Sequence, residues 1–210
     1  MFGRLLSVIM VLGLLGLWAA GLYAEPRQHL DMAGRASLPV QFDSEIVRIF
    51  VEEDSLRIDG LYRLVCRDTS SIIPPLFYPD PADSLLGDAR TLLLEARCAG
   101  EEWQSLPLIE HPQRPGVRWR FPQVGCDSVD VHTVYRQARW ANYGRYIVTT
   151  TQAWGRPLRH ARFEVYLPAG ARPVDFSFPF RRQEASNAVY YLFEADDFLP
   201  DRDIRFTWEP

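Results

Sequence analysis

Residues Ser55–Cys66, SLRIDGLYRLVC, show the pattern that decides the fold, because apolar side chains occupy one parity and charged side chains the other. The apolar set is Leu56, Ile58, Tyr62 and Leu64. The charged set is Arg57, Asp59 and Arg63. Successive side chains of a strand point to opposite faces, so this stretch predicts a strand with one buried face. Gly60 within it indicates a bulge or the close approach of another group.

The same alternation recurs along the rest of the chain. It is clear at residues 47–51, 129–135, 161–167 and 204–208, and no stretch has the period of an amphipathic helix. Tyr146–Ala153 also predicts a strand, followed by a turn at Trp154–Pro157. We therefore predict an all-β fold, an antiparallel β-sandwich of immunoglobulin-like type with roughly ten strands and little helix. A closed barrel is the alternative.

The first 24 residues predict an export signal. Arg4 is their only charge, Leu5–Leu17 is apolar, and small residues lead up to Ala24. We expect cleavage after Ala24 and a periplasmic or extracellular protein. The alternative is an uncleaved membrane anchor, since about 20 apolar residues suffice to span a bilayer. Residues 25–43 predict an extended lead-in, and residues 44–210 a single sandwich domain.

Three cysteines are present, Cys66, Cys98 and Cys126. An exported chain meets oxidising conditions, so one disulfide is expected, and we favour Cys98–Cys126. The alternative is that all three are reduced and buried. Their spacing matches no zinc-binding pattern. No metal and no cofactor is predicted.

Motifs of catalytic sites are missing from the sequence. It contains no Gly-x-Ser-x-Gly elbow, no His-Glu-x-x-His pair and no glycine-rich phosphate loop. His132 and His160 fall on the polar parity of predicted strands, without partners that the sequence identifies. We predict no catalytic residue. A hydrolase with a non-standard site, built on one of these histidines and the aspartates near the C-terminus, is kept as an alternative.

Residues 131–163 contain six arginines and no Asp or Glu, and we call them the acid-free band. Aromatic residues are interleaved with the arginines. The band supplies the candidate ligand-binding residues, which are Arg136, Arg139, Trp140, Tyr143, Arg145, Trp154 and Arg156. Three interpretations remain open. The arginines bind an anionic partner, they pair with acids on neighbouring strands, or they disperse in space.

The order of several segments resembles a known group of proteins. The segments are VEEDSLRIDGLYRLVCRD, LFYPDP, VYRQ, RYIVTTTQAWGRPLRHARFEVYLP and FSFPF. The chain resembles bacterial secreted β-sandwich domains of unknown function, such as the DUF4424-like group. The resemblance implies an exported, immunoglobulin-like sandwich and no particular activity.

From these features we predict a non-catalytic binding or structural module of the bacterial envelope or periplasm. The expected partner is an anionic glycan or a protein of the envelope, with membrane contact only if the N-terminal segment stays uncleaved. The formal net charge of −4 and the lack of any nucleic-acid motif exclude nucleic acid as the expected partner. A carbohydrate-binding module is a further alternative, which requires Trp140, Tyr143 and Trp154 to be coplanar on an open face.

Overall fold

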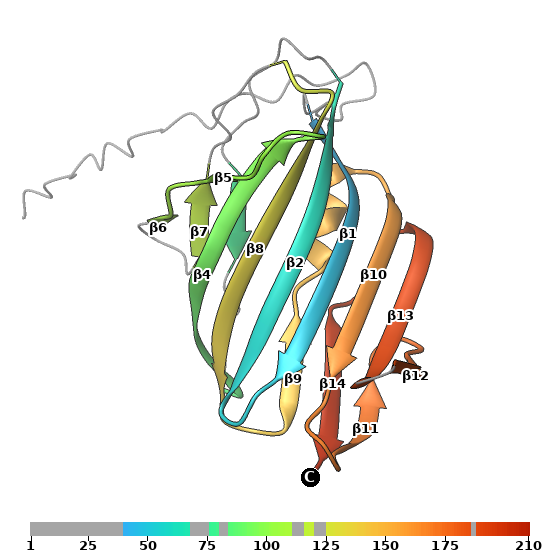
Figure 1. Cartoon of the computed structure of the whole chain (residues 1–210). Helices are drawn as coiled ribbons and strands as arrows, with labels where there is room; N and C mark the ends of the chain where they lie inside the picture. The colour runs from blue at the N-terminus through green and yellow to red at the C-terminus, as the bar shows by residue number, and fades with distance from the viewer. Residues whose placement is uncertain (1–39, 68–75, 80–83, 111–115, 120–124, 186–187) are drawn as a thin grey trace, which may run out of the picture.

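A computed structural model describes residues 40–67, 76–79, 84–110, 116–119, 125–185 and 188–210 (Figure 1). Nearly all of the regular structure in these residues is strand, so the all-β prediction is confirmed. The strands are β1 Val40–Val51, β2 Ser55–Cys66, β3 Leu76–Pro79, β4 Leu86–Cys98, β5 Gln104–Ser105, β6 Ile109–Glu110, β7 Gly116–Trp119, β8 Ser128–Arg139, β9 Tyr143–Tyr146, β10 Leu158–Tyr166, β11 Arg172–Phe176, β12 Arg181–Ala185, β13 Ala188–Phe198 and β14 Ile204–Glu209. A single 3₁₀ helix of the described residues, η1, spans Thr149–Trp154.

The structure describes the N-terminal part of the chain only from residue 40 onward. β1 begins at Val40, so residues 40–43 of the expected lead-in belong to the first strand. Residues 1–39, with the expected signal, lie outside the described residues. Among the residues that are described, no helix is long and apolar enough to cross a membrane.

Eight strands form one large sheet in the order β12-β13-β10-β1-β2-β8-β4-β5. Each neighbouring pair is antiparallel except β1 and β10, which run parallel. The expectation of purely antiparallel pairing is therefore wrong at this one junction. The long stretch of chain between β1 and β10 makes parallel pairing possible, because a parallel pair needs a crossover connection rather than a hairpin. Strands β11, β14 and β9 form a second sheet, and β3, β7 and β6 a third.

The core lies between the large sheet and the β11-β14-β9 sheet. Figure 1 shows the large sheet in front of β9, β14, β11 and η1. Tyr146 of β9 reaches across this space, with its hydroxyl 3.2 Å from that of Tyr62 and its ring centroid 6.0 Å from that of Phe163. Phe206 and Trp208 of β14 are buried in the same cluster. Burying these large apolar side chains stabilises the two layers against each other.

Strand β2 follows the prediction made from its alternation. Its apolar parity, including Leu56 and Ile58, is buried in the core, and the charged parity lies on the outer face of the large sheet. The expected close approach at Gly60 is also confirmed, because a Cβ there would overlap the hydroxyl of Tyr62. The bulge in this region falls on β1 instead, between Phe42 and Ser44.

The strand predicted at Tyr146–Ala153 is wrong over most of its length. β9 ends at Tyr146, and η1 follows from Thr149. Threonine side chains bond to nearby backbone here, since Thr151 Oγ1 donates to the Val148 carbonyl at 2.7 Å. Thr149 Oγ1 donates to Asp203 Oδ1 at 2.8 Å. Local and long-range bonds of this kind compete with a strand and outweigh the β-propensity of three consecutive threonines.

Candidate functional site

Three arginines from three neighbouring strands lie side by side on the outer face of the large sheet. Arg136 of β8 lies opposite Arg57 of β2 and also opposite Arg90 of β4. We call Arg57, Arg136 and Arg90 the arginine row. Directly opposed side chains are in contact range across a sheet, and like charges placed there repel each other.

A single carboxylate serves two members of the arginine row. Arg57 Nε lies 3.3 Å from one oxygen of Glu52, and Arg136 Nη2 lies 2.9 Å from the other. The Arg57 guanidinium also lies over the ring of Phe50, 3.9 Å from its centroid. Arg90 makes no ion pair with the part of the chain that the structure describes. Within that part, the row therefore holds more positive charge than its partner neutralises.

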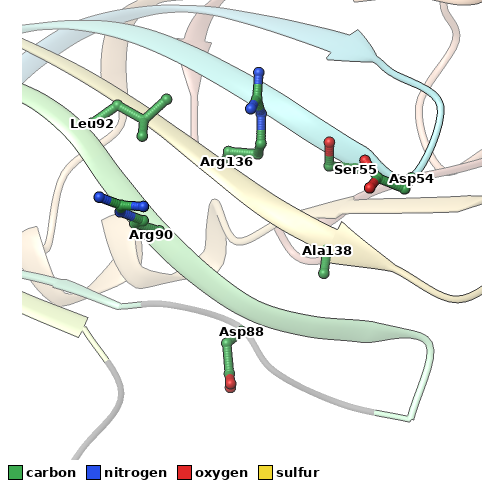
Figure 2. Close-up of a pocket in the computed structure, with 7 residues that line it drawn as sticks. All are labelled: Asp54, Ser55, Asp88, Arg90, Leu92, Arg136 and Ala138. Carbon is green, nitrogen blue, oxygen red and sulfur yellow. The ribbon is translucent and has the colours of Figure 1, made fainter.

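An open pocket of about 260 Å³ lies beside Arg90 and Arg136 (Figure 2). It is lined by Asp54, Ser55, Asp88, Arg90, Leu92, Arg136 and Ala138. Figure 2 shows the Asp88 side chain pointing away from both guanidinium groups. Asp54 and Ser55 lie where the β1–β2 turn leads into β2, at the end of the pocket near Arg136. The arrangement presents two planar, multiply donating cations to a shared space, which suits a carboxylate, sulfate or phosphate.

Arg139 is the most heavily bonded of the predicted site residues. Its Nη2 donates to the carbonyls of Glu52 and Glu53 at 3.0 and 2.7 Å, and its Nη1 donates to the carbonyl of Ala141 at 3.1 Å. Its guanidinium carbon lies 5.0 Å from the ring centroid of Trp208. Arg139 thus ties the β1–β2 turn to the end of β8, which is a structural role.

Trp140, Tyr143 and Trp154 are not brought together on one open face. Trp140 follows β8 and is 71% exposed. Tyr143 lies on β9 in the smaller sheet and packs against the core. Trp154 ends η1 and packs against Phe42, with ring centroids 5.9 Å apart. The platform required by the carbohydrate-module alternative is therefore not formed by these three residues.

The remaining arginines of the acid-free band are spread over β9, β10 and the connection that leads into β10. Arg145 lies on β9 opposite Arg205. Arg156 donates to Gln41 Oε1 at 3.2 Å, and Arg159 makes a two-pronged bond to Asp43 at 2.8 and 3.1 Å. Arg162 donates to Glu164 Oε1 at 2.7 Å. Pairing with neighbouring strands and dispersal in space thus both occur, and Arg136 is the one arginine of the band that lines the pocket.

Each of the two strand histidines lies between two carboxylates. His132 is 2.9 Å from Glu95 through Nδ1 and 3.0 Å from Asp59 through Nε2. His160 is 2.8 Å from Asp196 through Nδ1 and 3.2 Å from Glu194 through Nε2. An imidazole with both nitrogens so engaged has no free lone pair facing a substrate. No group of three or more His, Cys, Asp or Glu suited to a metal ion is found in the described residues.

One carboxyl group is buried in the core without a cationic partner. Glu45 of β1 is 1% exposed, and its Oε2 accepts a hydrogen bond from the Tyr146 hydroxyl at 3.3 Å. Burial raises the pKa of Glu45 to about 8, and the Tyr146 bond opposes this rise. The pKa of Tyr146 is also raised, chiefly by burial and then by Tyr62 and Glu45. Glu45 is enclosed between the sheets and does not line the pocket beside Arg90 and Arg136.

The predicted disulfide Cys98–Cys126 is confirmed, with Cα atoms 5.5 Å apart. Cys66 is a free, partly buried thiol, and burial followed by the charge of Asp127 raises its pKa. The disulfide joins the end of β4 to the segment that leads into β8. It therefore fixes the two strands that carry Arg90 and Arg136.

Arg57 and Arg90 were missed at the level of sequence, because both lie outside the acid-free band. The charged parity of Arg57 on the strand predicted at residues 55–66 was a signal that it faces outward, whereas no strand was predicted at Arg90. Their position next to Arg136 depends on the pairing of β2, β8 and β4, which lie far apart along the chain.

Comparisons with known proteins show the fold and no family. No protein-family model matches the sequence, nor does any curated protein. A protein of Legionella pneumophila, provisionally described as a nutrient-binding protein, has a TM-score of 0.61 and 15% identity over 81% of this chain and 67% of its own. An M1 zinc metallopeptidase of Deinococcus radiodurans has a TM-score of 0.50 and 12% identity over 82% of this chain and 44% of its own. A two-domain M1 zinc metallopeptidase bound to L-tryptophan has a TM-score of 0.51, with 12% identity over 81% of this chain and 43% of its own.

The chain thus spans less than half the length of the metallopeptidases that it resembles. Such distant likeness concerns the fold, and function has to be argued from the site itself.

Proposed function

We propose that this protein is an exported binding module of the bacterial envelope that holds an anionic group between Arg90 and Arg136. One observation carries the proposal. Arg90 of β4 and Arg136 of β8 lie opposite each other in register and line one open pocket, and the carboxylate that pairs with Arg136, Glu52, is shared with Arg57. The partner is an anionic glycan or an acidic protein of the envelope.

The energetics of the arginine row favour a bound anion. Like charges directly opposite each other on neighbouring strands destabilise a sheet. A carboxylate or phosphate between Arg90 and Arg136 would offset that repulsion and would accept paired hydrogen bonds from the planar guanidinium forks. Since Arg136 is half exposed and Arg90 exposed, the anion reaches them from solvent without any opening of the fold.

The proposal also includes export from the cell and a β-sandwich of immunoglobulin-like type. The Cys98–Cys126 disulfide supports an oxidising compartment, and the N-terminal sequence predicts the signal that would deliver the chain there. The core enclosed by the large sheet and the β11-β14-β9 sheet supports an elaborated sandwich of immunoglobulin-like type. The description of the Legionella protein is in keeping with a binding role.

The test is a calorimetric titration of the mature protein with inorganic phosphate and with galacturonate. Arg90→Gln and Arg136→Gln should each weaken anion binding about tenfold or more, because a hydrogen bond to a charged group contributes about 1.5–3 kcal/mol. Arg90→Gln should also raise the stability of the free protein slightly, since it removes the repulsion from Arg136.

Arg172→Gln is the matched control for these variants. Arg172 lies on β11 in the other sheet, is exposed and pairs loosely with Glu209 at 3.7 Å. The Arg172→Gln substitution removes the same charge from the molecule without changing the arginine row. Equal weakening by Arg172→Gln would show a general charge effect. Unchanged affinity in Arg90→Gln and Arg136→Gln would overturn the proposed site.

A further inference from the structure

The arginine row continues into a row of stacked aromatic rings. Phe50, which lies under the Arg57 guanidinium, stacks on Tyr166 with centroids 4.6 Å apart and planes 16° apart. Tyr166 stacks on Tyr190 with centroids 5.2 Å apart and planes 22° apart. Gln183 of β12 lies opposite Tyr190. We call the whole series, from Arg90 through the three rings to Gln183, the transverse row.

The transverse row crosses seven adjacent strands, β4, β8, β2, β1, β10, β13 and β12. Six strand-to-strand steps of about 4.8 Å make it roughly 29 Å long. A second pocket, of about 480 Å³, lies at its far end, where its lining includes Gln183, Arg181, Leu192 and His160 together with the acids Glu194 and Asp196. The row thus connects this pocket to the one beside Arg90 and Arg136.

A site of this length suits an extended chain rather than a single small anion. Its chemistry changes along its length, with guanidinium groups at one end, aromatic and hydroxyl groups in the middle and an amide at the other end. The Tyr166 hydroxyl already donates to Glu164 Oε2 at 2.6 Å, which fixes the middle ring in place. A ligand therefore meets a row that is ordered before binding, so little conformational entropy is lost.

The direction of the row favours a sugar chain over a peptide. The row runs across the strands, and their backbone groups are already paired within the sheet. An extended peptide laid along it would find no sheet edge to pair with. A sugar chain carries hydroxyl groups that remain solvated, and its carboxylates or sulfates match the arginines. Aromatic side chains with a polar end suit such a partly wet surface.

We infer that the transverse row is the binding track of an extended acidic polysaccharide, anchored by its acid groups at the arginine row. This inference rests on the proposed function and adds the class and the extended form of the ligand. The track has no catalytic step, since it involves only contacts with side chains already in place.

The experiment compares galacturonic acid with its linear oligomers of increasing length, by calorimetry on the mature protein. Affinity should rise with length until the oligomer spans the row and should then level off. Arg136→Gln should weaken every length, because it acts at the anchor. Tyr190→Ala should weaken the long oligomers about tenfold and leave the monomer unchanged.

Gln183→Ala provides a second variant at the far end, on an edge strand where folding is not at risk. It should also weaken only the long oligomers. Val174→Ala, at a site that is 62% exposed on β11, is the matched apolar control and should change nothing.

The outcomes separate the two proposals. Affinity that does not depend on length, with the monomer still bound through Arg90 and Arg136, would overturn the track and leave the anion site standing. Absence of binding by the monomer and by phosphate alike would overturn both. Equal or tighter binding of polyglutamate, with the same response to Tyr190→Ala, would replace the polysaccharide with an acidic peptide.

Discussion

Two rows of side chains cross the same three strands on the outer face of the large sheet. One row pairs opposite charges, and the other places like charges side by side. In the first row, Asp130 of β8 lies between Arg63 of β2 and Arg97 of β4, at 2.9 and 3.3 Å. We call it the paired row. In the arginine row, the same central strand places Arg136 between two further arginines. The two rows share their three strands, their face of the sheet and their direction, so the central residue accounts for the difference in charge pairing.

The paired row is a structural ion-pair cluster, whereas the arginine row requires a counter-ion from outside the chain. The Asp130 side chain is only 6% exposed, because the two guanidinium groups cover it. The hydrogen bond and charge of Asp130 raise the pKa of the Arg63 guanidinium. The paired row satisfies its own charges, whereas the arginine row satisfies them only in part through Glu52.

The interior of the protein contains a third arrangement of charge, an acid that is buried without a cationic partner. Glu45 is enclosed by the Tyr146 hydroxyl and apolar side chains, so its protonated form is favoured in the folded state. Its pKa is about 8 in the folded protein, against the ordinary glutamate value of 4.5 that represents the unfolded chain. The unfolded chain therefore loses this proton first, and stability should fall as pH rises from about 4.5 to about 8.

Replacing this acid should give the largest effect of the three cases. Glu45→Gln removes the titration but keeps the shape, so it should flatten the pH profile and stabilise the protein above pH 8 by on the order of 5 kcal/mol. Urea unfolding at pH 5 and pH 8.5 measures this difference. Glu184→Gln, on exposed β12, is the control and should keep the wild-type slope. If Glu45→Gln also keeps that slope, the group is already ionised in the folded state.

Removing the central acid of the paired row should have the next largest effect. Asp130→Asn leaves Arg63 and Arg97 facing each other across β8 without a counter-charge. We expect a loss of about 2 kcal/mol, because charge-assisted hydrogen bonds are lost while the partly exposed arginines remain hydrated. Denaturant midpoints at low and high salt check this. Asp196→Asn, an exposed acid beside His160, should change stability little. A similar loss in both variants would mean that burial between the arginines adds nothing.

The face that each strand turns to the core was predictable from sequence, because alternation with period two records it locally. Leu56 and Ile58 inside, Arg57 and Arg63 outside, and the close approach at Gly60 all follow from one stretch. The parallel pairing of β1 with β10 was not predictable, since nothing local distinguishes it from an antiparallel pair. The η1 helix was missed because a bond to Asp203, far along the chain, helps to set it.

The candidate site was predictable only in part, because it depends on register. Arg136 was identified from a run of residues without acids, but that criterion excluded Arg57 and Arg90. The same criterion included Arg139, whose guanidinium is occupied by backbone carbonyls of the β1–β2 turn. Charge along a sequence reports composition, whereas a binding row across strands is set by pairing between distant segments.

The arginine row can be rebuilt as a copy of the paired row by one substitution. Arg136→Asp places a carboxylate between Arg57 and Arg90, as Asp130 lies between Arg63 and Arg97. Because opposed unlike charges then replace opposed like charges, we expect stability to be unchanged or raised by up to about 1 kcal/mol. Phosphate and galacturonate should no longer bind, since the new carboxylate occupies the position of the anion. Urea unfolding and calorimetry on the same sample measure both quantities, and Arg172→Asp controls for net charge. A variant that binds anions normally, or that loses as much stability as Asp130→Asn, would show that the two rows are not equivalent and that Arg136 serves the fold.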